Sequence, residues 1–83
     1  MSSSVNELLN LAVNAQQNNN FIDAEKFYIK ALDADPNNYA ALINFGVLLK
    51  TLNRLDAAKE SFVKAIKINP KIELGYLNLG NIF

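Results

Sequence analysis

The sequence contains neither cysteine nor histidine. The lack of cysteine excludes disulfide bonds, thiolate chemistry and zinc ribbons. The lack of histidine removes the commonest general base and the commonest metal ligand. The formal net charge is zero, so the chain as a whole has no electrostatic attraction to nucleic acid or to an anionic membrane.

Long hydrophobic runs are missing as well. No stretch approaches the roughly 18 apolar residues that a membrane span requires, and the opening MSSSVNELLN lacks the basic and apolar segments of a secretory signal. We therefore expect a cytoplasmic protein with no membrane partner, in which residues 1–4 are a native leader or a remnant of cloning. With 83 residues, 51% of them hydrophobic, the chain predicts one small domain with a real core.

What the sequence does contain is an internal repeat with a period of 34 residues. The stretch DAEKFYIKALDADP begins at Asp23, and its counterpart AAKESFVKAIKINP begins at Ala57. Extending this match in both directions divides the chain into a first unit (5–38), a second unit (39–72) and a third unit (73–83) that stops after about a third of its length. A period of this length indicates that the same structural unit recurs along the chain.

Each complete unit predicts two helices. Apolar residues recur at helical spacing on both segments of the first unit; they are Leu8, Leu11, Ala12 and Ala15, then Ala24, Tyr28, Ala31 and Leu32. The asparagine-containing stretches 16–20 and 51–54 are predicted to form the turns between the helices, since asparagine tolerates left-handed backbone geometry.

The outer boundaries of the helices are marked too. Ser4 with Glu7 forms a capping-box pattern at the start of the first helix. Pro36 and Pro70 each follow a second helix, and proline disfavours helix at the residue before it, so both second helices are predicted to end there.

Small residues recur at fixed places in the repeat. Ala12, Gly46 and Gly80 occupy one such place on the first helices. A glycine inside a helix costs about 1 kcal/mol relative to alanine, so the glycines predict the close approach of a neighbouring helix. Large residues are expected to fill the space beside them, namely Leu11, Phe45, Leu79, Tyr28 and Phe62.

These residues resemble the tetratricopeptide repeat (TPR) pattern of a 34-residue helix–turn–helix unit. The matching residues of the second unit are Leu42, Phe45, Gly46, Leu49, Ala58, Phe62, Ala65 and Pro70. The first unit matches with Leu8, Leu11, Ala12, Ala15, Ala24, Tyr28, Ala31 and Pro36. The resemblance covers residues 5–83 and implies an all-α fold, an α-solenoid of about two and a third units and five helices in a right-handed superhelix.

In this family the first helix of each pair lines a concave face on which peptides or helices of partner proteins bind. The resemblance implies that this face comprises Asn6, Leu9, Asn10, Val13 and Gln17 of the first unit. The second unit would contribute Ala40, Ile43, Asn44, Val47 and Lys50. The third would contribute Leu74, Leu77, Asn78 and Asn81.

Two subsets of this face have alternative interpretations. Asn10, Asn44 and Asn78 form a ladder whose amides either pair with a peptide backbone or cap neighbouring backbone of the chain itself. An apolar set favours an apolar partner surface, such as an amphipathic helix, unless some of its members pack between helices. That set is Leu9, Val13, Ile43, Val47, Leu74 and Leu77.

One binding mode known in the family does not match this sequence. Members that bind acidic chaperone tails use a lysine-and-asparagine clamp, but Leu9, Val13, Leu74 and Asn78 stand where that clamp has lysine, asparagine, lysine and arginine. Only Asn44 agrees. We do not expect binding of a carboxylate tail.

Other chemistry has little support in the sequence. DADPNN, which begins at Asp33, resembles the start of a calcium loop but lacks its glycine, so we interpret it as a helix end and turn. Lys64, Lys67 and Lys71 are too few for nucleic-acid binding. No nucleophile has a visible base partner, so we expect no catalytic residue, no metal site and no cofactor.

The partial third unit lacks its second helix. Tyr76, Leu79 and Phe83 should face that helix and would form an exposed apolar edge. Either the chain is a fragment of a longer repeat protein, or another copy covers the edge and makes a homo-oligomer. The two explanations are compatible.

The function hypothesis is a protein-interaction module, a scaffold that binds a peptide or helix of a partner in the concave groove. One alternative is the regulatory arm of a larger enzyme, such as a glycosyltransferase, because the family often occurs there. A second alternative is a self-association module that forms dimers through the C-terminal helix.

Overall fold

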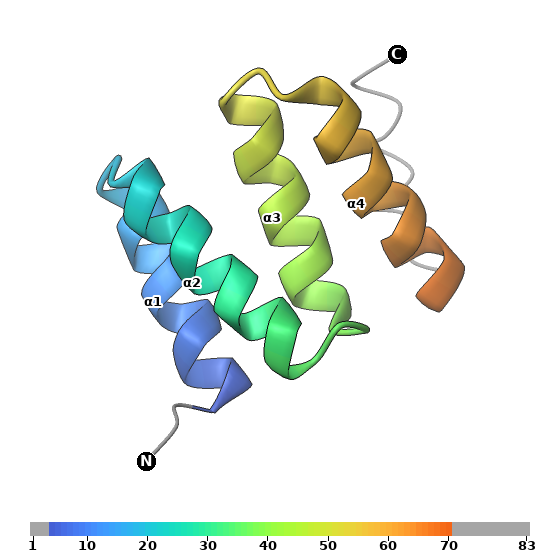
Figure 1. The fold of residues 1–83 in the computed structure, drawn as a ribbon, viewed down its shortest axis with the longest axis horizontal. Helices are drawn as coiled ribbons and strands as arrows, with labels where there is room; N and C mark the ends of the chain where they lie inside the picture. Colours follow the sequence, from blue (N-terminus) through green and yellow to red (C-terminus); the bar gives the residue numbers. More distant parts are fainter. Residues whose placement is uncertain (1–3, 71–83) are drawn as a thin grey trace.

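A computed structural model describes residues 4–70 of the chain, and these residues form four helices: α1 (Val5–Gln17), α2 (Phe21–Ala34), α3 (Tyr39–Thr51) and α4 (Leu55–Ile68). Within this range there is no strand, which confirms the all-α prediction. Figure 1 shows two helical hairpins side by side, α1 with α2 and α3 with α4. The predicted fifth helix and partial third unit lie outside the described residues.

Side-chain caps and prolines mark the helix boundaries, as predicted at Ser4, Pro36 and Pro70. Ser4 Oγ accepts a hydrogen bond from the Glu7 N–H at 3.1 Å and caps α1. Asn38 does the same for α3, accepting from the Ala41 N–H at 2.9 Å. The residue before Pro36 leaves the helical region at φ −143° and ψ 85°, so α2 ends there, and α4 ends in the same way before Pro70.

The two hairpin turns share one backbone geometry. Asn19 and Asn53 both have φ 62°, the left-handed conformation. In the first turn the Asn20 N–H donates to the Ala15 carbonyl at 2.8 Å and the Asn19 N–H donates to Gln16, which is a Schellman motif. The second turn repeats both bonds. The prediction that asparagine supplies the turn geometry is confirmed.

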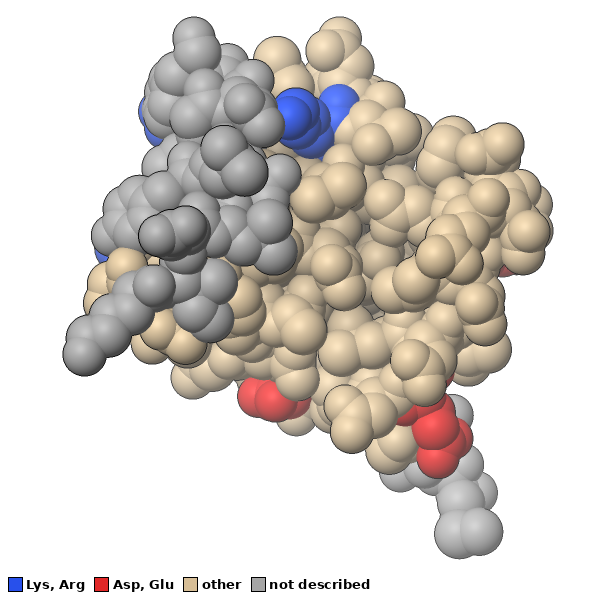
Figure 2. Space-filling model, turned by 180° about the vertical axis from the view of Figure 1, so that it is seen from behind, with Lys and Arg blue, Asp and Glu red and all other residues tan. Residues whose placement is uncertain are grey.

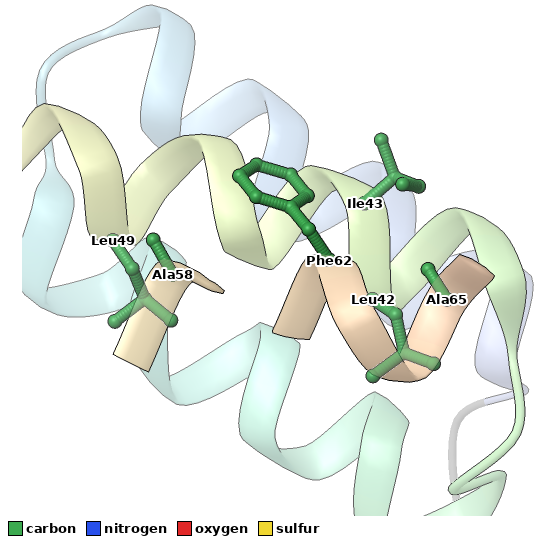
Figure 3. Close-up of a cluster of buried hydrophobic side chains, with 6 residues drawn as sticks. All are labelled: Leu42, Ile43, Leu49, Ala58, Phe62 and Ala65. Carbon is green, nitrogen blue, oxygen red and sulfur yellow. The ribbon is translucent and has the colours of Figure 1, made fainter. Parts of the chain in front are cut away.

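The core of the second hairpin depends on a missing side chain. Figure 3 shows the buried cluster formed by Leu42, Ile43, Leu49, Ala58, Phe62 and Ala65. A Cβ atom added at Gly46 would lie 2.5 Å from Cε1 of Phe62, so the ring packs directly on the α3 backbone. The Ser61 hydroxyl also donates to the Leu42 carbonyl at 2.6 Å. The predicted close approach at Gly46 is confirmed.

The hairpins contact each other mainly through α2 and α3. The rings of Tyr28 and Phe45 stack with their centroids 5.8 Å apart, and Leu48 is buried in the same cluster as Tyr28. At one edge Arg54 makes two hydrogen bonds to the carboxylate of Glu25, at 2.5 and 3.0 Å. Apolar packing and one ion pair therefore join consecutive units.

One expected packing contact is absent. Leu11 was predicted to fill space between helices, but 44% of its surface is exposed. Its counterpart Phe45 is covered because the preceding hairpin lies against it, whereas no described helix lies against that side of α1. Three neighbours on that side, Glu7, Asn14 and Asn18, are polar and exposed where the second unit has apolar residues. The prediction for Leu11 was wrong because its contact depends on a neighbouring unit.

Candidate functional site: the face formed by α1 and α3

Charge is distributed unequally between the first and second helices of the hairpins. The only charged residues of α1 and α3 are Glu7, in the first turn of α1, and Lys50, in the last turn of α3. The second helices are each rich in charge; they carry Asp23, Glu25, Lys26, Lys30 and Asp33, then Asp56, Lys59, Glu60, Lys64 and Lys67. The surface that α1 and α3 share, which we call the α1/α3 face, is therefore nearly uncharged.

The same asymmetry is visible on the molecular surface. In Figure 1 helix α2 lies in front of α1, so the view from behind in Figure 2 looks onto the α1 side. Figure 2 shows a broad uncharged area there, with basic atoms at its upper edge and acidic atoms at its lower edge. A partner that lies along this face meets amide and apolar side chains rather than charge.

A hollow of about 260 Å³ lies between α1 and α3. Its lining combines two valines with amide and phenol groups and contains no charged side chain; the residues are Val13, Gln16, Gln17, Tyr28, Asn44 and Val47. Four of the six, Val13, Gln17, Asn44 and Val47, are among the residues that the sequence predicted for partner binding. We call this feature the α1/α3 hollow.

Two residues of the hollow are joined to each other. The hydroxyl of Tyr28, a buried residue of α2, donates a hydrogen bond to Gln16 Oε1 at 2.7 Å. Burial raises the pKa of Tyr28 from 10.0 to about 12, so the hydroxyl keeps its proton over the whole physiological range. Tyr28 thus joins the core between the hairpins to the α1/α3 face.

Three of the amide groups on this face are not used by the chain itself. Within residues 4–70 the side chains of Asn10, Gln17 and Asn44 make no hydrogen bond. The alternative that the ladder asparagines cap neighbouring backbone is therefore not realised at Asn10 or Asn44. Both remain available as donors and acceptors for another molecule.

The remaining predicted residues of this face differ in accessibility. Asn6, Asn10 and Ala40 are exposed, whereas Leu9 and Lys50 are partly buried. Ile43 is only 2% exposed and belongs to the core of the second hairpin. For this residue the alternative interpretation holds, in which a member of the apolar set packs between helices. Several predicted residues lie outside the described residues. These are Leu74, Leu77, Asn78 and Asn81 of the binding face, and Tyr76, Leu79 and Phe83 of the self-association edge.

Sequence reasoning missed the role of Gln16 and Tyr28 in the hollow. Gln16 was assigned to the turn and Tyr28 to the core. One signal was present: the counterpart of Tyr28 is Phe62, so a hydroxyl occurs in one unit where the other has none. A buried hydroxyl requires a hydrogen-bond partner, which here is Gln16.

The DADPNN stretch forms a boundary between two helices. DADPNN contains the end of α2 and the cap of α3, and the Asn38 amide donates to Asp35 Oδ2 at 3.2 Å. No group of three metal-ligating side chains occurs within residues 4–70. None of the four described helices is long and apolar enough to cross a bilayer.

Comparison with known proteins decides the family. A family model described as tetratricopeptide repeat matches residues 15–77, which is more than half of the chain. The chain belongs to the tetratricopeptide repeat family. The structure agrees with this membership. The described residues form two helical hairpins, a proline follows each second helix, and small residues pack with aromatic rings in the core.

TPR relatives include both enzymes and other proteins. The chain is 32% identical over 83 residues to the UDP-N-acetylglucosamine--peptide N-acetylglucosaminyltransferase of Caenorhabditis elegans, covering 100% of this chain and 7% of that protein. It is 35% identical over 69 residues to the probable enzyme of the same description, SPINDLY, of Solanum lycopersicum, covering 83% and 7%. Superkiller protein 3 of Schizosaccharomyces pombe is 39% identical over 54 residues, covering 65% and 4%. The chain thus spans less than a tenth of each relative.

Proposed function

We propose that this TPR chain is a protein-interaction module that binds a peptide or helical segment of a partner protein on the α1/α3 face. The observation that carries the proposal is a set of side-chain amides that make no hydrogen bond within residues 4–70, including those of Asn10 and Asn44, on a surface almost free of charge. Amides left without internal partners are suited to pair with the polar groups of another chain. TPR units are generally protein-interaction modules, which agrees with this reading.

The proposal assigns binding and no catalysis to these residues. The chain contains no histidine or cysteine, and the hollow is lined by amides, valines and a tyrosine whose pKa is raised. None of these groups is poised for proton transfer near neutral pH. We propose that the residues of this face have no catalytic role and that the module acts in the cytoplasm.

A display experiment tests the binding function. The chain is immobilised and a library of random 12-residue peptides displayed on phage is selected against it. Peptides enriched on the native chain should be lost on the double variant Asn10→Glu, Asn44→Glu, because two charges are added to the face. The matched control is Lys30→Gln with Lys64→Gln, which makes the same change in net charge on α2 and α4. Absence of any enriched peptide, or equal loss on the control, would contradict the proposal.

A second candidate is the regulatory arm of a larger glycosyltransferase. It is favoured by the similarity of the whole chain to the N-acetylglucosaminyltransferase of Caenorhabditis elegans. Determining the full reading frame of the gene tests it. A transferase domain in the same polypeptide would establish the arm, whereas its absence would leave the interaction module as the function.

Self-association through Tyr76, Leu79 and Phe83 stays a prediction. Light scattering coupled to size-exclusion chromatography over a concentration series should show a dimer or larger assembly. Leu79→Glu with Phe83→Glu should convert it to a monomer. A monomer at every concentration of the native chain would contradict this prediction and leave the binding proposal intact.

A further inference from the structure

The α1/α3 hollow places one amide in a defined orientation. Because Gln16 Oε1 accepts the hydrogen bond of the Tyr28 hydroxyl, rotation of the Gln16 amide is restrained. Its Nε2 group makes no hydrogen bond within residues 4–70, so both of its hydrogens are left for a ligand. Gln16 is therefore an oriented donor at a site that is open to a partner.

The hollow is large enough to admit one side chain of a partner, with water around it. At about 30 Å³ of liquid volume per water molecule, its volume of about 260 Å³ would hold on the order of eight waters. A main chain running along the α1/α3 face would lie over this opening, and one of its side chains would enter. Val13 and Val47 offer apolar contact to the stem of that side chain, and the amides offer hydrogen bonds to its end.

The chemistry of the lining selects the kind of side chain. A charged group would lose water in a hollow that has no opposite charge to pair with it. An aliphatic group would cover the Gln16 and Asn44 amides without satisfying them. A carboxamide has an apolar stem and an end that both donates and accepts, so it matches every part of the lining.

We propose that the α1/α3 hollow is a subsite for an asparagine or glutamine side chain of the partner, with Gln16 as the specificity-determining residue and Tyr28 as the residue that positions it. This inference rests on the proposed function, because it requires a partner peptide on the α1/α3 face. It adds the identity of the side chain that the face recognises. The second unit has no equivalent pair of hydrogen-bonded side chains, because Phe62 lacks the hydroxyl and Lys50 replaces Gln16.

The test starts from the peptides selected by phage display on the native chain. Aligned sequences should share an asparagine or glutamine at one position. Synthetic versions with glutamine, leucine, glutamate or lysine at that position are then measured by fluorescence anisotropy. Glutamine should bind about fivefold more tightly than leucine, the equivalent of one hydrogen bond, and more tightly than either charged residue.

A charge substitution provides the specific readout. Gln16→Glu keeps the acceptor for Tyr28 but replaces the donor with a negative charge, so the preference should change from glutamine to lysine. Asn14→Glu, on the same helix but outside the hollow, adds the same charge and should leave the preference unchanged. Tyr28→Phe should reduce the preference for glutamine over leucine severalfold without reversing it. Circular dichroism confirms that each variant is folded.

The outcomes separate the two proposals. If no peptide is enriched on the native chain, the binding function fails and the subsite fails with it. If peptides bind but show no carboxamide preference, or if Gln16→Glu and Asn14→Glu behave alike, the subsite is overturned while the binding function stands.

Discussion

At the residue scale, both hairpins bury a small residue of the first helix and an aromatic residue of the second helix. In the first hairpin Ala12 and Tyr28 share one buried cluster. In the second, Gly46 and Phe62 occupy the equivalent places, and the ring lies too close to α3 to leave room for a methyl group. In the second hairpin the ring therefore packs against the backbone of α3 itself.

Replacing Gly46 with alanine should destabilise the protein, because an added methyl overpacks against the buried Phe62 ring at a cost of about 1–3 kcal/mol. This cost opposes the gain of about 1 kcal/mol in helix propensity. The free energy of unfolding in urea, followed by circular dichroism, measures the balance. Ala12→Gly is the control and should lose about 1 kcal/mol from propensity and about 0.8 kcal/mol from the buried methyl group that it removes. A more stable Gly46→Ala variant would mean that the ring moves aside.

Tyr28 should make stability sensitive to alkaline pH. Its folded-state pKa of about 12 lies above its ordinary value of 10.0 because burial disfavours the phenolate. The stabilisation from the buried neutral phenol is complete below pH 10 and is lost as pH rises through about 12, by on the order of 2 kcal/mol.

Urea titrations at pH 8 to 12 on the native chain and on Tyr28→Phe test this prediction. The variant lacks the titrating group and should lose less stability over that range. Identical pH profiles for the two proteins would show that other groups control alkaline unfolding.

At the element scale, the helix lengths are set by turn chemistry at both ends. Each hairpin turn ends the first helix with the same pair of backbone hydrogen bonds, which requires a left-handed residue. Asparagine occupies that place twice, and a capping side chain or a proline marks the next boundary. Local chemistry thus divides the described chain into helices of 13 or 14 residues.

Asn53→Ala should therefore destabilise the protein by about 1 kcal/mol, because alanine tolerates the left-handed conformation less well than asparagine. Asn53→Gly should be near neutral, since glycine adopts that conformation without steric cost. Thermal and urea unfolding measure both variants. Asn20→Ala serves as the control, because Asn20 has φ −85° and its side chain makes no capping bond. Equal effects of Asn53→Ala and Asn20→Ala would contradict the explanation.

At the scale of the whole molecule, the two described hairpins are coupled through an apolar seam and the ion pair between Glu25 and Arg54. Tyr28 and Phe45 form the centre of the seam, and Glu25 with Arg54 lies at its exposed edge. Stability of a repeat array depends on the stability of each unit and on such interfaces between neighbours. Changes at the seam should alter the cooperativity of unfolding as well as its midpoint.

The ion pair should make this coupling sensitive to acid. The hydrogen bond that Glu25 accepts from Arg54 lowers the pKa of Glu25 below 4.5. Burial raises the pKa, but this effect is smaller. A lowered folded-state pKa means that the stabilisation is present above pH 4.5 and is lost as pH falls through the folded value.

Urea titrations between pH 7 and 3, at low and high salt, measure this dependence. Glu25→Gln should reduce the acid sensitivity and its dependence on salt, because the pair is partly exposed and therefore screened. Glu60→Gln removes the same charge from the surface of α4 and should have a smaller effect. An unchanged acid profile in Glu25→Gln would show that the pair does not couple the hairpins.

The sequence by itself determined the periodic features of this protein. The 34-residue repeat, the helices between capping residues and prolines, the asparagine turns and the close contact at Gly46 all follow from local chemistry or from helical spacing. Four residues of the α1/α3 hollow were also among those that the resemblance to the tetratricopeptide repeat pattern implied for the concave face. These features could be predicted because each depends on residues close in sequence or on a period that recurs.

Only the tertiary structure decided which predicted positions are accessible and how they are joined. Ile43 is buried and Leu11 is exposed, although both lie on first helices, because exposure depends on whether a neighbouring helix covers that side. The bond between Tyr28 and Gln16 joins two helices across a turn. Helical periodicity specifies the side of a helix on which a residue lies, but the packing of one helix against another decides what that side meets.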